Sequence, residues 1–510
     1  MSLSRRGFLG VGAAGSAALL FGNVGPAWRA AADSSSVPAI GGPLSGQSTS
    51  GLYNDLQTMV SFGPRLTGSP AHAAYINWLE QGLTAAGLTV QRTSQSFTRW
   101  QAGTTGLQIN SGPSTGAVNV GAPYPYCGST PGNGVTGPLV YVNQGSPQDL
   151  ANVNLQGAIA VFDVGPFTEI SVGDFDPLKV SRWDPDGTLS PDEPITMAFY
   201  PDTPFPLLDA VQQAGAIGAI VMIDAAPAYV ANQWTPFDIP MQGIPAVMLD
   251  RVASDVVRPQ SQAGGVSATL TMTAQLIPSS TDMLVSVIPG ASDEIVVLNT
   301  HTDGQNAIEE NGTVVLLGIA RALAQIPQRK RPRTYVIVFA TAHFLTKSYA
   351  DAPIGAGLKS TQLFIDTRPD LMARTVASFC IEHIGPRQWV QSGNDYVATG
   401  LTEPHFHITS PVASLQNLCA SASKFADFRR SEVLNPFPGH GPNGNLVAEG
   451  DWMYQAGVPT IQTVSGPHRL LQIDQGSVLD TEIDPIQWQR GVNFCFAVAG
   501  GLSLIPTSQL

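Results

Sequence analysis

Histidine or carboxylate side chains follow four apolar segments in the second half of the sequence. The segments cover residues 294–298, 335–340, 376–381 and 460–464. The side chains after them are His301 with Asp303, His343, Glu382 with His383, and His468. Glu310, which stands just before a helical pattern, adds a further carboxylate. Imidazoles and carboxylates around an open water position are the usual composition of a catalytic zinc site, so the pattern predicts a hydrolytic metal centre.

The apolar segments must be strands if they are to bring these side chains together. From residue 276 to residue 502 the strand patterns alternate with helical patterns, such as residues 313–324. This alternation predicts a mostly parallel, doubly wound sheet covered by helices. In such a sheet, ligand-binding residues collect at the carboxyl ends of the strands. The expected fold class is therefore α/β, with residues 51–130 and 276–505 forming the catalytic domain.

Residues 131–275 have a different character, because short strand patterns are separated there by Gly and Pro turns. The order of LQGAIAVFDVG, AVQQAGAIGAIVMID and GIPAVMLD resembles a protease-associated domain. That resemblance implies a β-rich insert that governs substrate access or protein contacts. The other reading of this region is a second α/β subdomain of no known role.

Composition and the first residues indicate an exported protein. Arg5 and Arg6 precede a weakly apolar run, residues 11–21, and the segment resembles a twin-arginine export signal. We expect a signal peptide over residues 1–32 and a flexible lead-in over residues 33–50. A secreted, periplasmic or cell-envelope location follows, with no membrane anchor after signal removal, because the run is too short to span a bilayer.

The charge balance and the cysteines narrow the function further. The chain has a formal charge of −13 and no basic stripe, so no nucleic-acid partner is expected. The four cysteines are scattered without a CxxC pair, which argues against a structural zinc knuckle. Cys380 and Cys495 lie in apolar segments and are expected to be buried free thiols.

Together these motifs resemble the secreted di-zinc aminopeptidase family, which includes glutamate carboxypeptidases and glutaminyl cyclases. The resemblance covers about residues 50–130 and 280–505. The segment FGPRLTGS, residues 62–69, matches the opening of the family. Its first metal motif, His-x-Asp, is matched by residues 301–303, and its bridging Asp-Asn-Gly by residues 310–312. Glu382 and His468 stand where the family has an Asp ligand and its last His ligand.

The resemblance implies a peptidase-like site with two divalent ions. One ion would use His301, Glu310 and Glu382. The other would use Glu310, His343 and His468. Asp303 would support His301 from behind. Zinc is the expected metal, and the two Asp-to-Glu changes make manganese or iron the alternatives.

The sequence departs from the family at its Glu-Glu pair, which normally supplies a general base and a ligand. Ala342-His343-Phe344 stands there instead. If Ala342 takes the base position, His343 is a ligand and the base is missing. If His343 takes the base position, Phe344 removes a ligand. We favour the first register, because it keeps five ligands. The candidates for water activation are then Glu309, His383 or a metal-bound hydroxide.

We therefore expect an exported metal-dependent hydrolase that cleaves amide or peptide bonds in peptides or small amides. Two alternatives stay open: non-peptidase chemistry on the same fold (an amidase, lactonase or cyclase), and a catalytically silent binding protein. Among the other histidines, His72 is expected at an exposed helix position, while His405 and His407 are expected in structural or surface roles. The sequence does not give the oligomeric state.

Overall fold

The computed structural model describes residues 42–44, 47–165, 170–195, 205–237, 239–344, 360–438, 444–466, 469–473 and 479–510. The expected signal peptide, the part of the lead-in before residue 42, and His468 lie outside the described residues.

Among the helices that are described, none is both long enough and apolar enough to cross a membrane. Cys127, Cys380, Cys419 and Cys495 are all buried and free.

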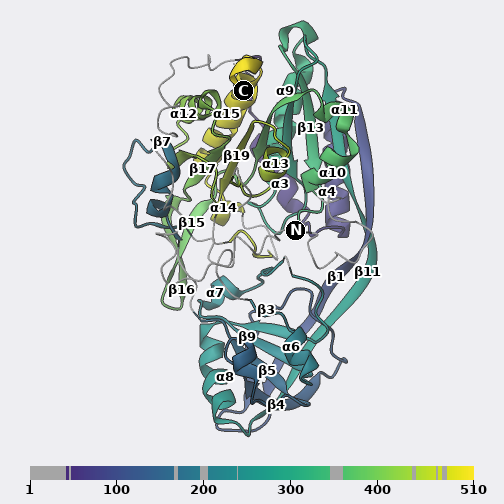
Figure 1. Cartoon of the computed structure of the whole chain (residues 1–510), viewed down its shortest axis with the longest axis vertical. Helices are drawn as coiled ribbons and strands as arrows, with labels where there is room; N and C mark the ends of the chain where they lie inside the picture. Colours follow the sequence, from purple (N-terminus) through teal and green to yellow (C-terminus); the bar gives the residue numbers. More distant parts are fainter. Residues whose placement is uncertain are drawn as a thin grey trace.

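Four parallel strands form the centre of the upper lobe in Figure 1. In spatial order they are β13 (Thr334–Ala340), β12 (Ile295–His301), β14 (Thr375–Ile381) and β19 (Thr460–Ser465). Almost all of their residues are buried, which explains why they read as unbroken apolar runs in the sequence. The prediction of an α/β fold with a large, mostly parallel sheet is confirmed.

Helices cover both faces of this sheet. Val296 and Leu298 of β12 belong to the same hydrophobic cluster as α9 (Gly312–Gln325). Ile295 and Val297, which point to the other face, pack with Leu363 and Phe364 of α10 (Ser360–Thr367). This alternation is the two-residue period of a strand buried on both sides, and it produces the doubly wound arrangement. The helices α3 (Leu52–Ser61), α4 (Pro70–Ala85) and α15 (Pro485–Leu502) pack on the α9 side.

Antiparallel pairings extend the central sheet. On one side β19 pairs with β17 (His405–Thr409), which runs parallel to β18 (Ser431–Leu434). β18 in turn pairs with β7 (Lys179–Trp183). β7 falls within residues 131–275, the range expected for the insert, yet it forms the edge of the catalytic sheet.

A long two-stranded ribbon joins the upper lobe to the lower lobe in Figure 1. It consists of β1 (Val90–Ile109) and β11 (Ser267–Ile288), which pair antiparallel with one irregularity between Ala102 and Thr105. The sequence alone predicts only two short strands here, at residues 88–91 and 95–98. It does not mark the rest of β1, because much of that strand is exposed and does not alternate between apolar and polar residues.

Four parallel strands form the part of the sheet in the lower lobe: β4 (Val135–Tyr141), β5 (Ile159–Asp163), β9 (Gly218–Met222) and β10 (Ala246–Leu249). They continue the sheet of the ribbon, because β4 pairs antiparallel with β11. The helices α6 (Asp209–Gln213) and α8 (Arg251–Ala263) lie in the same lobe (Figure 1). The strand positions agree with the short strands read from the sequence. The identity of this lobe as a protease-associated domain, and its boundaries, stay predictions.

Shorter elements complete the described chain. They are β2 (Gly116–Val118), β3 (Ala122–Pro123), α5 (Pro147–Leu150), β6 (Ile170–Ser171), η3 (Val172–Leu178), β8 (Pro194–Ile195), α7 (Pro227–Val230), η4 (Gln328–Lys330), α11 (Pro369–Met372), β15 (Arg387–Ser392), β16 (Asp395–Thr402), α12 (Ala413–Phe425), α13 (Gly450–Gln455), α14 (Leu479–Glu482) and η6 (Thr507–Gln509).

Candidate metal centre

The carboxyl ends of β12, β13 and β14 bring the candidate residues to one edge of the sheet. His301 is the last residue of β12 and lies in register with Ala340, the last residue of β13. His343 follows β13 by three residues, and Glu382 and His383 follow β14 directly. Neighbouring strands in a sheet are about 4.8 Å apart, so residues at adjacent strand ends meet. The structure therefore brings His301, His343, Glu382 and His383 together, while His468 lies outside the described residues.

Two of the imidazoles have their orientation fixed by backbone carbonyl groups. Nδ1 of His301 lies 2.8 Å from the carbonyl oxygen of Asp303, and Nδ1 of His383 lies 2.6 Å from that of Ser465. A carbonyl oxygen only accepts hydrogen bonds, so each Nδ1 carries a hydrogen, and in the neutral ring each Nε2 has a free lone pair. Both Nε2 atoms are buried and have no hydrogen-bond partner among the described residues. Metal-binding histidines have this arrangement, with the second nitrogen oriented by a backbone acceptor.

The spacing of the free atoms fits a metal ion. Nε2 of His383 lies 3.6 Å from Oε2 of Glu309 and 3.9 Å from Oε2 of Glu382. Nε2 of His301 lies 4.0 Å from Oε1 of Glu309. Two tetrahedral ligands of zinc, each about 2.1 Å from the ion, lie roughly 3.4 Å apart, so small side-chain movements would close this shell. Among the described residues, two triads have their ligand atoms within 4.8 Å of one another: His301 with Glu382 and His383, and His301 with Glu309 and His343.

The two adjacent glutamates before α9 have different surroundings. Glu309 points between the two imidazoles, and within the part of the chain that the structure describes its Oε2 has no hydrogen-bond partner. Glu310, which the family resemblance indicated as the bridging ligand, instead forms a fully buried ion pair with Arg65. Glu310 belongs to neither triad. Its role as a ligand stays a prediction of the resemblance.

The carboxylate of Asp303 bonds to the loops around the centre and not to the ring of His301. Its carboxylate accepts hydrogen bonds from the hydroxyl of Thr67 and from the backbone N–H groups of His343 and Phe344. The carboxylate lies 3.9 Å from Nδ1 of His301, because the nearer acceptor is the backbone carbonyl of Asp303 itself. Asp303 therefore fixes the segment after β13 and ties it to the FGPRLTGS segment.

Glu449 is a functional candidate that the sequence pattern did not reveal. Its buried carboxylate accepts a hydrogen bond from Nδ1 of His343 and two more from Thr361, at 3.0 Å from the backbone nitrogen and 2.7 Å from the hydroxyl. The backbone N–H of Glu449 donates to Glu382 at 3.2 Å. Glu449 precedes the short helix α13 and follows no strand, so the strand-end signal that marked the other residues was missing.

The charged neighbours change the proton affinity of two imidazoles. Burial alone lowers the pKa of His343, but the hydrogen bond and the charge of Glu449 outweigh it and raise the pKa to about 9. Burial likewise lowers the pKa of His383, while the carboxylates of Glu309 and Glu382 raise it overall. In turn, His343 overcomes the effect of burial on Glu449 and holds the pKa of that carboxyl well below its usual range.

Sharp turns at the strand ends aim two of these side chains. Ala342 has φ of 67° and His383 has φ of 56°, both in the left-handed region. Such backbone costs about 1–3 kcal/mol at residues other than glycine and persists only where the surroundings enforce it. The turn at His383 is held in part by the hydroxyl of Ser465, which donates to the carbonyl oxygen of His383 at 3.0 Å.

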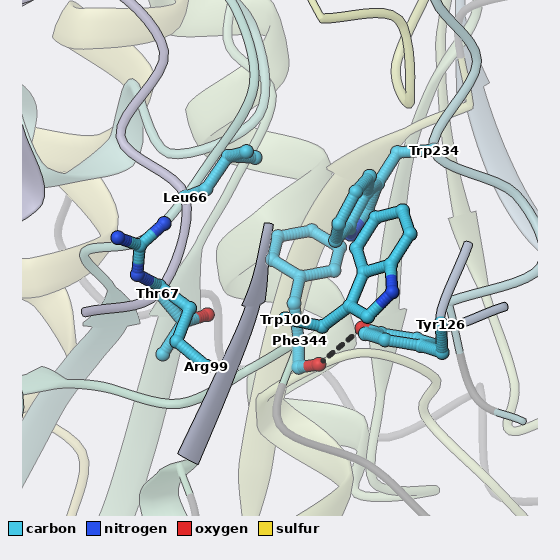
Figure 2. A pocket seen from close by; sticks show the side chains of 7 residues that line it. All are labelled: Leu66, Thr67, Arg99, Trp100, Tyr126, Trp234 and Phe344. Carbon is cyan, nitrogen blue, oxygen red and sulfur yellow. Dashed lines mark hydrogen bonds between the residues drawn. The ribbon is translucent and has the colours of Figure 1, made fainter. Parts of the chain in front are cut away.

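An aromatic pocket borders the centre next to Phe344. Figure 2 shows the rings of Trp100, Tyr126, Trp234 and Phe344 gathered on one side of the pocket, opposite Arg99. The hydroxyl of Tyr126 donates to the carbonyl oxygen of Phe344 at 3.1 Å. The ring of Phe344 in turn meets that of His301 edge-on, with the centroids 6.0 Å apart. Residues far apart in the sequence thus form an apolar wall beside the candidate ligands.

Three further histidines are buried away from the candidate ligands. His72 is fully buried, not exposed as its helical context indicated, because Nε2 bonds to Thr302 at 2.9 Å and Nδ1 accepts from Gly68 at 3.1 Å. His405 and His407 lie in β17, where both bond to the hydroxyl of Thr463. Their contacts are structural.

Comparisons with known proteins agree with this architecture. The sequence matches no protein-family model and no curated protein. The structure is similar to a peptidase M28 precursor from Shewanella amazonensis, with a TM-score of 0.62 and 17% identity over 90% of this chain and 93% of that one. It is also similar to a zinc aminopeptidase from Bacillus subtilis, with a TM-score of 0.58 and 14% identity over 90% and 97%. An aminopeptidase from Aneurinibacillus gives a TM-score of 0.54 and 17% identity over 88% and 92%.

This chain has the zinc-aminopeptidase fold. The match covers most of each chain, so both lobes contribute to it. At these identities the likeness establishes the fold alone. The chemistry must therefore be argued from the residues at the strand ends.

Proposed function

We propose that this chain is a metal-dependent hydrolase that cleaves amide or peptide bonds. One observation carries the proposal: two buried imidazoles, each fixed through Nδ1 by a backbone carbonyl group, present free Nε2 atoms toward buried carboxylates. The names of the structural neighbours, two aminopeptidases and a peptidase, support this class of reaction.

His301, His383 and Glu382 would hold the metal ion. Two imidazoles and one carboxylate leave an open coordination position, as catalytic zinc sites do. A zinc ion there would polarise the substrate carbonyl group and lower the pKa of a bound water. His383 is a candidate base from its sequence position, but its free Nε2 and its place in the triad support a ligand role instead.

Glu309 and His343 would carry the protons. Water adds to the carbonyl carbon, and Glu309 is placed to accept a proton, because its free oxygen lies between the two imidazoles. When the C–N bond breaks, the amine nitrogen needs a proton. His343 is suited to donate it, because Glu449 holds its other nitrogen and stabilises its charged form. Glu309 thereby takes over the function of the missing Glu-Glu pair.

Substrate class and location are parts of the same proposal. The neighbouring peptidases suggest peptides or small amides as substrates. The paired arginines near the N-terminus support export, which would place the enzyme outside the cytoplasm. A lower lobe of the protease-associated kind would control access to the centre.

A substrate panel with metal-loaded protein tests the proposal. Amino-acyl anilides, N-blocked anilides, esters and lactones should be offered to the wild type and to His301→Ala. We expect amide hydrolysis that His301→Ala abolishes. Turnover of lactones or esters alone would favour the non-peptidase alternative. Metal binding without turnover of any substrate would favour a silent binding protein.

A further inference from the structure

The buried arginine of the FGPRLTGS segment lies beside the candidate metal centre, and four of its five N–H donors have partners. Nε of Arg65 donates to Glu310, Nη1 donates to the carbonyl oxygens of Met59 and Gly63, and Nη2 donates to that of Asn306. The side chain is 1% exposed, and that of Glu310 is 0% exposed. Arg65 is therefore a fixed positive charge inside the protein.

The backbone holds Arg65 in this position. Its N–H donates to the carbonyl oxygen of Gly304 at 2.8 Å, and the N–H of Gly304 donates back at 3.1 Å. The guanidinium carbon lies 5.7 Å from the ring centre of Tyr75, which covers it from another side. These contacts leave Arg65 no alternative position from which to release Glu310.

Glu310 is not free to bridge two metal ions. A bridging carboxylate needs both of its oxygens for ions, and one oxygen of Glu310 is taken by Arg65. The other oxygen has no hydrogen-bond partner among the described residues and lies against Gly304, where a Cβ would come within 1.8 Å of it. The cation that pairs with Glu310 is thus the side chain of Arg65.

The carboxylates that face the imidazole of His383 are those of Glu309 and Glu382, with Oε2 at 3.6 Å and 3.9 Å from Nε2. Glu310 is not among them, because it is paired with Arg65.

We infer that Arg65 takes the place of a second metal ion, so that this chain binds one divalent ion where the family resemblance implies two. The inference rests on the metal site proposed above. It assigns Glu310 and Arg65 a positioning role: the pair holds the loop of residues 303–310 against the FGPRLTGS segment.

Metal stoichiometry tests the inference without relying on activity. The protein is loaded with excess zinc, desalted, and analysed by native mass spectrometry and elemental analysis. The informative variant is Arg65→Met combined with Glu310→Gln, because replacing both partners of a buried pair is tolerated far better than removing one. Arg92→Met with Glu80→Gln, which removes a partly exposed ion pair, is the matched control.

We expect one zinc per chain in the wild type, in the double variant and in the control. The zinc dissociation constant of the double variant should rise by about 10- to 100-fold or less, since 10- to 100-fold is the typical cost of changing a group that supports metal ligands. Two firmly bound ions in the wild type would overturn this inference but not the proposed metal site. Loss of the ion from the double variant would do the same. No ion in any of the proteins would overturn the proposed metal site as well.

Discussion

The imidazole ring of His343 stacks on that of His301, with the ring centroids 4.2 Å apart and 15° between the ring planes. The lone pairs of an imidazole lie in the ring plane, so the lone pairs of two stacked rings run side by side and do not converge. The two rings therefore cannot both bind one ion in this arrangement. The stacking favours a role for His343 in proton transfer, and places it directly above a proposed ligand.

Removing His343 should leave the metal in place. We expect His343→Gln to retain zinc and to lose about 100- to 10,000-fold in kcat, the usual contribution of a proton-transfer group. Elemental analysis beside a kinetic assay measures both. His301→Ala is the matched comparison and should lose the metal. Loss of zinc from His343→Gln would return His343 to the ligand role that the sequence indicated.

Glu449 should control the pH dependence of the reaction through His343. Since Glu449 raises the pKa of His343 to about 9, Glu449→Gln should lower that pKa. If His343 must be protonated to donate a proton, activity falls as the pH rises through its pKa. The alkaline limb of the kcat profile should then move to lower pH in the variant. An unmoved limb together with a lower kcat would mean that Glu449 acts only in folding.

The hydroxyl of Thr67 should contribute measurably to stability. It donates to the buried carboxylate of Asp303, and a hydrogen bond to a charged group contributes about 1.5–3 kcal/mol. We expect Thr67→Val to lower the free energy of unfolding by that amount in urea titrations. Thr58→Val is the control, because its hydroxyl bonds at the surface and should change stability by less than about 0.5 kcal/mol. Equal effects of the two changes would show that Thr67 does not support Asp303.

His407 should make the fold sensitive to acid. Burial lowers the pKa of His407 from 6.5 to about 3, and its ring stacks on Phe494 at 4.0 Å. Between these two pH values the unfolded chain binds a proton that the folded chain excludes, so stability falls as the pH drops below 6.5. His407→Phe removes this effect.

The measurement is the difference in unfolding free energy between His407→Phe and the wild type at several pH values. That difference should shift in favour of the variant by about 1.4 kcal/mol for each pH unit below 6.5. The lost hydrogen bond to Thr463 adds only a constant offset. A difference that does not change with pH would contradict the prediction.

Apolar runs made the catalytic sheet predictable. The segments read at residues 335–340, 376–381 and 460–464 differ from β13, β14 and β19 by at most one residue at each end. Such strands are buried on both faces, so their composition alone marks them. The ribbon of β1 and β11 could not be predicted in the same way, because its partners are distant in sequence and its surface is partly exposed.

The candidate site was predictable where it depends on strand ends and not where it depends on tertiary contacts. His301, Glu382 and His383 follow strands, and the sequence order alone placed them together. Glu449 reaches His343 from a loop more than a hundred residues away, and no local pattern marks such a partner. The different surroundings of Glu309 and Glu310 depend on Arg65, whose position only the folded chain defines.

The pairing of Ile109 with Ala268 has a consequence for the architecture as a whole. The chain leaves the ribbon for the lower lobe and returns to it at neighbouring positions. Most of that lobe is therefore, in topological terms, the turn of one hairpin. A segment whose ends meet imposes little loop-closure entropy on its host, however long it is. The lower lobe can be exchanged for another module, or for a short turn, without rethreading any strand of the catalytic sheet other than the β7 edge.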